Sequence, residues 1–290
     1  MVAAASPPPT TTSTTADAAS TPDIPNFTRA ELAAAVRRVL GAWSDVLSCV
    51  RSVASAATGQ QGGVGDAARG AILAATGVVW EGCDALVGLC EAGVVGLAVR
   101  RAEEWREVLL DAVVEMREWG EEVDEDGGDE EDGGERSGEE EGGFEVFGAA
   151  NRLGKGDGEL RALLEASVRK LKTVAVLYQA LVKRRLKTFP PPFASAPSSK
   201  DGGANAAAAV AAQRVRTLDD LMALLKSIPE SVDELASAFY DLDGDEARVL
   251  LKKCCDDAVR AATIVKQNWD GKDDEFTAWS GKWKDAMGTS

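Results

Sequence analysis

Residues 98–119 read AVRRAEEWREVLLDAVVEMREW, and the spacing of apolar residues in this stretch decides the fold class. Apolar side chains recur at alternating steps of four and three, at Ala98, Ala102, Trp105, Leu109, Ala112, Met116 and Trp119. That alternation puts them on one stripe of an α-helix and is typical of helices that pack against other helices. Arg100 and Glu104, four residues apart, fall outside the stripe and suit a face in water.

The same periodicity recurs along the chain, and no segment predicts a strand. Helices are expected from Phe27 to the glycines at 59–65, over 66–89, over 93–119, from near Asp157 to Val182, and repeatedly after residue 211. In the first of these helices the apolar stripe is Val36, Leu40, Trp43, Leu47 and Val50. We therefore predict an all-α fold of long antiparallel helices in one or two packed bundles.

Two sequence signals predict helix starts. Thr28 and Glu31 have the spacing of a capping box. Ser227 and Glu230 have the same spacing around Pro229, which predicts that one helix stops there and another begins.

Composition divides the chain into four regions. Residues 1–25 form a Pro, Thr, Ser and Ala tail that is too polar to pack and is expected to be disordered. Residues 26–189 form an N-terminal helical bundle, interrupted by a disordered acidic insertion at 120–145. A Pro, Ala and Gly linker at 190–210 precedes a C-terminal helical region at 211–290.

Charge excludes some classes of partner. The 290 residues carry a net charge of −16, of which −13 lies between residues 120 and 145. The rest of the chain is nearly neutral, so it has no basic footprint for nucleic acid. No run of 18 uncharged apolar residues exists, so no membrane span is expected. Five cysteines without framework spacing favour a reducing cytosol or nucleus.

The absence of histidine argues against an enzyme. It removes the commonest general base, the commonest metal ligand and every Ser-His or Cys-His arrangement. DLDGDEARVLLK (241–252) begins like a calcium loop but has Glu246 where glycine and Lys252 where glutamate would be needed. An acidic turn that caps the next helix explains it better. We predict no catalytic residue, no cofactor and no metal.

Two other segments have a functional and a structural interpretation. LVKRRLK (181–187) could be an anion patch or nuclear import signal, but a solvated helix end is favoured. TGVVWEGCDAL (76–86) places Val79 and Cys83 toward a core, Trp80 at its margin, and Glu81 and Asp84 on the other side. Its glycines suit the close approach of a neighbouring helix, so this is a packed helix rather than an active site.

A resemblance adds to this interpretation. The string Val79, Trp80, Glu81, Gly82, Cys83 and Asp84, followed by a helix ending REVLLDAVVEMREW, resembles the central signature of the cyclin-D-binding (cyclin-D-interacting) protein family. The later segment LLKSIPESVDELASAFYDLDGDEARVLL (224–251) is similar to that family's C-terminal half. The likeness covers about 230 residues. It implies an all-helical protein that binds D-type cyclins, restrains cell-cycle progression and moves between cytoplasm and nucleus.

The predicted function is therefore a non-enzymatic protein-protein interaction, with a cyclin or another cell-cycle regulator as partner. The alternative is a helical-bundle structural adaptor of the cytoskeletal-linker type. Candidate partner-binding residues are Trp80, Trp119, Trp269 and Trp279, although burial in the protein's own core is the more common role of each. The sequence does not determine the oligomeric state.

Overall fold

The computed structural model describes residues 24–57, 65–121, 152–154, 156–190 and 203–288. Its helices are α1 (Asn26–Ala57), α2 (Asp66–Glu121), α3 (Gly158–Leu181), α4 (Gly203–Tyr240), α5 (Gly244–Ile264) and α6 (Glu275–Gly288), with a π-helical turn, η1 (Val182–Leu186), directly after α3. These residues form no strand, so the all-α prediction is confirmed. The predicted tail and acidic insertion lie almost entirely outside the described residues, and α4 begins inside the predicted linker.

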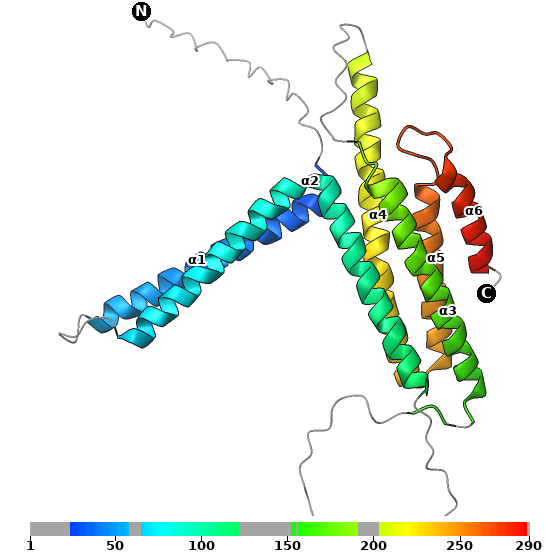
Figure 1. Cartoon of the computed structure of the whole chain (residues 1–290), viewed down its shortest axis with the longest axis horizontal. Helices are drawn as coiled ribbons and strands as arrows, with labels where there is room; N and C mark the ends of the chain where they lie inside the picture. Colours follow the sequence, from blue (N-terminus) through cyan, green and yellow to red (C-terminus); the bar gives the residue numbers. More distant parts are fainter. Residues whose placement is uncertain (1–23, 58–64, 122–151, 155, 191–202, 289–290) are drawn as a thin grey trace, which may run out of the picture.

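The helices form two parts joined by a kink in α2 (Figure 1). The first half of α2 pairs with α1 to make a two-helix arm, which we define as residues 26–57 and 66–92. The second half of α2 packs with α3, α4, α5 and α6 into a helical bundle, which we define as residues 94–121 and 156–288 in so far as they are described. The arm projects from one end of the bundle.

The kink lies at Gly93, whose φ of 61° and ψ of −169° are not helical. Only glycine adopts such a conformation without steric cost, because it has no Cβ. The sequence predicted separate helices over 66–89 and 93–119. Two predicted helices thus meet without a loop between them, and the glycine alone turns the chain.

The bundle has one continuous core built from all of its helices. The stripe that decided the fold class is inside it, since Leu109 and Met116 are fully buried and Trp105 and Trp119 pack against the core. The residues after the predicted linker belong to the same core, for example Leu225 and Phe239 of α4. The two predicted helical regions therefore pack as one body.

The capping box predicted at Thr28 is wrong. The helix begins at Asn26, and the carboxylate of Asp219 on α4 accepts hydrogen bonds from the backbone N–H groups of Asn26 and Phe27 at 2.9 and 3.1 Å. Glu31 instead pairs with Arg101. A residue 193 positions away supplies the cap, which local sequence spacing cannot reveal.

The helix break predicted at Pro229 is also wrong, since α4 runs through it. A proline has no N–H, so it leaves the carbonyl four residues earlier without its helical donor. That carbonyl belongs to Leu225, and the buried hydroxyl of Tyr178 on α3 donates to it at 2.6 Å. A tertiary hydrogen bond thus replaces the lost helical one and lets the helix continue.

Candidate functional site

The two helices of the arm approach most closely at the glycine of the tryptophan-centred string. A Cβ at Gly82 would lie 3.2 Å from Cγ2 of Val39. Around it the arm has a small core of Ala42, Val46 and Val79, with Ala75 and Cys83 partly buried. The small and aliphatic residues of the string therefore face α1.

The other members of the string face water. Trp80 is 67% exposed, and Glu81 and Asp84 are exposed beside it. Neither carboxylate has a hydrogen bond or ion pair with a nucleophile or base among the described residues. The cluster is the outer surface of a packed helix rather than the wall of a cleft.

The arm exposes far more apolar side chain than its small core hides. On α1 the exposed residues are Val36, Leu40, Trp43, Leu47 and Val50, and on α2 they are Leu73, Val78, Trp80 and Val87. The α1 stripe was expected to be the packed face of this helix. It is instead exposed, and the buried stripe, which includes Ala42 and Val46, lies one residue before it.

Most of these side chains lie on the same side of the arm. In α1 the exposed stripe follows the buried stripe by one residue, which is a rotation of about 100°. In α2 the exposed Leu73, Trp80 and Val87 also follow inward-facing residues by one position. Because the two helices are antiparallel, the same rotation carries both stripes to one side of the pair. We call these eight residues, Val36, Leu40, Trp43, Leu47, Val50, Leu73, Trp80 and Val87, the arm face.

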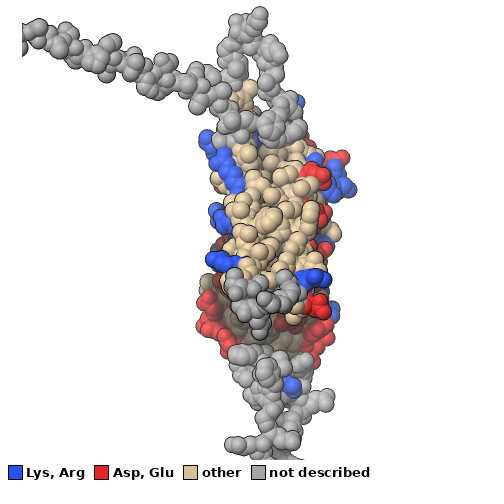
Figure 2. Space-filling model, turned by 90° about the vertical axis from the view of Figure 1, so that its left-hand side faces the viewer, with Lys and Arg blue, Asp and Glu red and all other residues tan. Residues whose placement is uncertain are grey.

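Figure 2 looks at the molecule from the side on which the arm projects. It shows a broad surface without charged side chains, with Lys and Arg along one border and mixed charge along the other. This view is taken from the side opposite the bundle, so the surface points away from the bundle helices. Among the described residues, Ile24 and Val78 are also exposed. The remaining seven exposed large hydrophobic side chains are scattered over the bundle.

The three other tryptophans considered from the sequence are half-buried in the bundle. Trp119 packs edge-on against Tyr240 at a centroid distance of 5.3 Å. Trp269 packs edge-on against Phe189, and its indole N–H donates to the carbonyl of Arg185 at 2.8 Å. Trp279 contacts the rings of Phe276 and Trp283. Each thus has contacts within the chain, whereas Trp80 lies on the arm face.

Arg185 is the polar residue that sequence reasoning missed. The basic stretch 181–187 was expected to be a solvated helix end, yet the Arg185 side chain is fully buried. It pairs with both oxygens of Asp274 at 2.7 and 2.9 Å and donates to the carbonyls of Val265 and Lys266. Its guanidinium also lies 4.3 Å from the centroid of the Phe276 ring.

These contacts fix the C-terminal segment to the bundle. The Arg185 guanidinium lowers the pKa of Asp274 to about 2, so this carboxylate stays ionised at neutral pH. Arg184, the residue before Arg185, pairs instead with Glu275 on the surface. The π-helical turn η1 contains both arginines, and only one of them points inward. No sequence pattern distinguishes two adjacent arginines in this way.

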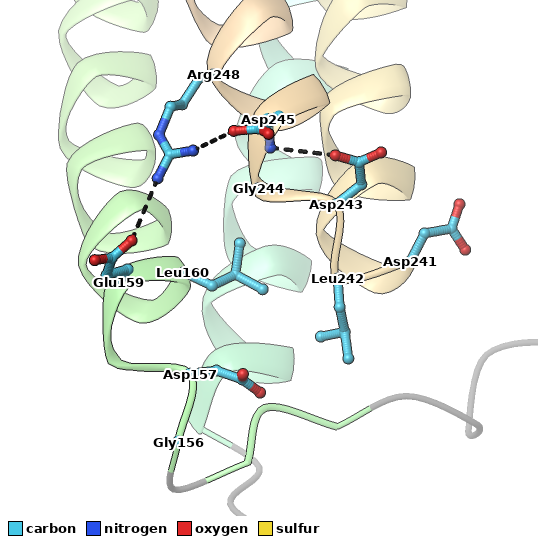
Figure 3. Close-up of a pocket in the computed structure, with 10 residues that line it drawn as sticks. All are labelled: Gly156, Asp157, Glu159, Leu160, Asp241, Leu242, Asp243, Gly244, Asp245 and Arg248. Carbon is cyan, nitrogen blue, oxygen red and sulfur yellow. Dashed lines mark hydrogen bonds and ion pairs between the residues drawn. The ribbon is translucent and has the colours of Figure 1, made fainter.

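The acidic turn that resembled a calcium loop lines an open pocket of about 750 Å³ between the start of α3 and the α4–α5 turn (Figure 3). Oδ1 of Asp243 accepts hydrogen bonds from the backbone N–H groups of Asp245 and Glu246, which caps α5 and confirms the prediction of a helix cap. Arg248 pairs with Asp245 three residues earlier on α5 and, across the pocket, with Glu159 of α3.

The carboxylates of this pocket do not converge on a common point. Asp241 points away from Arg248 and Asp245 in Figure 3. Within the described part of the chain, no three Cys, Asp or Glu side chains are placed to hold a metal ion. The buried thiol of Cys254 has its pKa raised to about 12 by desolvation, so it is a poor nucleophile.

One described helix, α2, meets the length and composition of a membrane span. Its most apolar window has a mean hydropathy of 1.7, and 22% of that window is buried. The sequence predicted no span, because acidic residues interrupt the apolar run. The same helix contains the kink at Gly93 and part of the arm face. Its exposed apolar surface is therefore the feature of the fold that most needs a partner.

Comparison with known proteins finds a family model that matches the part of the chain containing the arm. Residues 28–122 match the family model described as Grap2 and cyclin-D-interacting, N-terminal, and this range spans α1 and α2 almost completely. No curated protein and no solved structure matches the chain significantly. The resemblance that rested on Val79, Trp80, Glu81, Gly82, Cys83 and Asp84 is confirmed, since residues 28–122 are similar to the N-terminal region of Grap2 and cyclin-D-interacting proteins.

Proposed function

We propose that this chain is a non-enzymatic interaction protein that binds a D-type cyclin through its arm and so regulates cell-cycle progression. The single observation that carries the proposal is the coincidence of the family match with the arm. The matched residues 28–122 include all eight residues of the arm face. The name of the family gives the class of partner, and the arm gives a surface that is apolar, exposed and free of catalytic groups.

The chemistry of the surface suits a helical partner. An amphipathic helix can lay its apolar side against the shallow seam between α1 and α2. Trp43 and Trp80 are 50% and 67% exposed, and tryptophans on an otherwise aliphatic surface are typical anchors of an interface. Loss of such an anchor typically weakens binding by about 2 kcal/mol, or roughly 30-fold.

Binding of the purified full chain to a purified D-type cyclin, measured by titration calorimetry, tests the proposal. We expect Trp80→Ala and Trp43→Ala each to weaken binding at least tenfold without changing the helical circular dichroism. Val249→Ala is the matched control, since Val249 is similarly exposed but lies on α5 in the bundle. Failure of the wild-type chain to bind the cyclin would refute the proposed partner.

A structural adaptor of the cytoskeletal-linker type is the rival function. Purification of the full chain from cells, followed by mass spectrometry, separates the two: cyclins and their kinases support our proposal, and cytoskeletal proteins support the rival. An enzyme built on carboxylates would show a hydrolytic activity that Glu81→Gln or Asp84→Asn abolishes. We expect no such activity.

We further infer a location in the cytoplasm and nucleus. The five cysteines are all free in the structure, which suits a reducing compartment. Fluorescence microscopy of the tagged full chain, combined with cell fractionation, tests this location. Recovery in a membrane or secreted fraction would contradict it.

A further inference from the structure

We propose that, in the absence of another partner, the arm face is covered by the arm face of a second copy of this chain. The two arms would form a four-helix bundle around a two-fold axis that runs along the arms. The inference concerns self-association and does not depend on which protein the arm binds in the cell. Three observations carry it: the size of the arm's own core, the area of its exposed face and the distribution of charge along its edges.

The arm buries few of its own apolar side chains. Its own core contains three buried residues, although α1 alone has 32 residues. Isolated helices gain most of their stability from the packing of an apolar face, and here the larger side chains of both helices lie outside the core. A second pair of helices laid on the arm face would enclose these side chains and complete a bundle.

The arm is large enough for a stable dimer. At 1.5 Å per residue, α1 is about 48 Å long, and two helices side by side are roughly 20 Å wide. The surface that one arm can bury is therefore on the order of 900 Å², and stable interfaces bury about 800 Å² per partner. The area thus meets what a stable dimer needs.

Charge selects the arrangement of the two copies. On the helical wheel, the basic residues Arg37 and Arg51 of α1 lie beside the arm face on its outer edge. The corresponding edge of α2 has Asp84 and Glu91, with Arg69 nearer the tip of the arm. An axis along the arms sets α1 of one copy over α2 of the other, so that Arg37 meets the acidic part of this edge, whereas Arg51 lies near the level of Arg69. The alternative two-fold axis, across the arms, would set the basic edges together.

The register of the arm predicts which charges meet. Gly82 of α2 lies opposite Val39 of α1 within one arm. Because the two helices are antiparallel, a residue of α1 and a residue of α2 lie at the same level along the arm when their numbers add up to about 121. Because the proposed axis preserves the level, Arg37 of one copy faces Asp84 of the other. The uncharged surface of the arm in Figure 2 points away from the bundle of its own copy, so with that surface at the interface the two bundles leave on opposite sides.

The mass of the purified full chain, measured by sedimentation equilibrium under reducing conditions, tests the inference. We expect a dimer at micromolar concentration. Leu40→Asp and Leu47→Asp should each shift the protein to monomer without altering its helical circular dichroism, because both side chains are already in water in the single chain. Val249→Asp on α5 is the matched control and should remain dimeric. A wild-type chain that stays monomeric at about 100 µM, the weak end of specific association, or dimeric Leu47→Asp protein, would overturn the proposal.

A charge exchange tests the axis. Arg37→Glu and Asp84→Arg should each weaken the dimer about tenfold, and the double variant should restore most of the wild-type dissociation constant, because the pair is re-formed with reversed sign. Additive losses in the double variant would rule out the axis along the arms. A cyclin that binds the arm face must also displace the second copy, so a heterodimer should form at the expense of the homodimer.

Discussion

The arm and the bundle share one helix, yet their apolar stripes have opposite fates. Leu109, in the second half of α2, is fully buried, whereas Leu47, which recurs with the same helical spacing on α1, is 60% exposed. Both belong to alternating steps of four and three. The periodicity therefore identifies a helix with an apolar face, and the presence of other helices decides whether that face is covered.

Both α3 and α4 pack against the second half of α2, and α1 accompanies the first half. The bundle has enough neighbours to bury even a charged residue, Arg185, completely. The arm is a single pair of helices and buries three hydrophobic side chains in its core. The difference shows that an interaction surface can be made simply by extending a helix pair beyond the core that supports it.

The largest effect is expected where the bundle holds its buried charge. Arg185→Ala should lower the free energy of unfolding by about 3–5 kcal/mol, since it removes the buried partner of a pair and leaves three backbone carbonyls and Asp274 without this donor. Urea denaturation followed by circular dichroism measures the loss. Hydrogen exchange should also become faster in α6, which the pair ties to the bundle.

The neighbouring arginine supplies the control. Arg184 pairs with Glu275 at the surface, with both side chains largely exposed, so Arg184→Ala should cost less than about 1 kcal/mol. Equal losses in the two variants would mean that burial of Arg185 does not contribute in the way that the structure indicates.

The next prediction compares a leucine of the bundle with a leucine of the arm. Leu109→Ala should destabilise the protein by about 2–5 kcal/mol, because it opens a cavity in the bundle. Leu47→Ala should change the stability by less than about 1 kcal/mol when measured at a concentration at which the chain is monomeric. Thermal and urea unfolding of both variants would show the difference, and a large loss for monomeric Leu47→Ala would mean that the arm face is covered within the chain.

A smaller effect is expected at the proline of α4. Tyr178→Phe should cost about 1–3 kcal/mol, because it leaves the buried carbonyl of Leu225 without a donor. In a Pro229→Ala background, the backbone N–H can donate to that carbonyl again, and the cost of Tyr178→Phe should fall. A double-mutant cycle by urea denaturation measures this coupling. Strictly additive losses would show that the tyrosine does not replace the missing helical bond.

The sequence was sufficient for the helices and for most of the bundle core. Stripes such as that through Leu109 and Met116 are buried as their spacing predicted. The sequence was insufficient wherever a residue far along the chain supplies a hydrogen bond to a helix. Asp219 caps α1, and Tyr178 donates to the carbonyl that Pro229 leaves without a donor, so local capping signals at Thr28 and Ser227 gave the wrong answer.

In the candidate site, too, the sequence predicted what depends on one helix and missed what depends on other helices. Helical spacing separated the inward Val79 and Cys83 from Glu81 and Asp84 on the outer side, because that separation depends on one helix alone. It did not predict that the stripe through Leu47 would be exposed, because exposure depends on how far the bundle extends along α2. The turn at Gly93 ends that extension; the sequence placed a boundary between two helices there but did not show the direction in which the chain turns.

The smallest effect distinguishes two glycines of the arm. A methyl group added at Gly77 would meet no atom within 4 Å, so Gly77→Ala should raise the free energy of unfolding by up to about 1 kcal/mol through helix propensity. At Gly82 the same methyl group would lie 3.2 Å from Val39 Cγ2, and the crowding should offset the gain. Thermal unfolding of the two variants measures the difference. If Gly82→Ala were as stabilising as Gly77→Ala, the helices of the arm would be more loosely paired than their contact indicates, and a second copy or a partner would then have to hold them together.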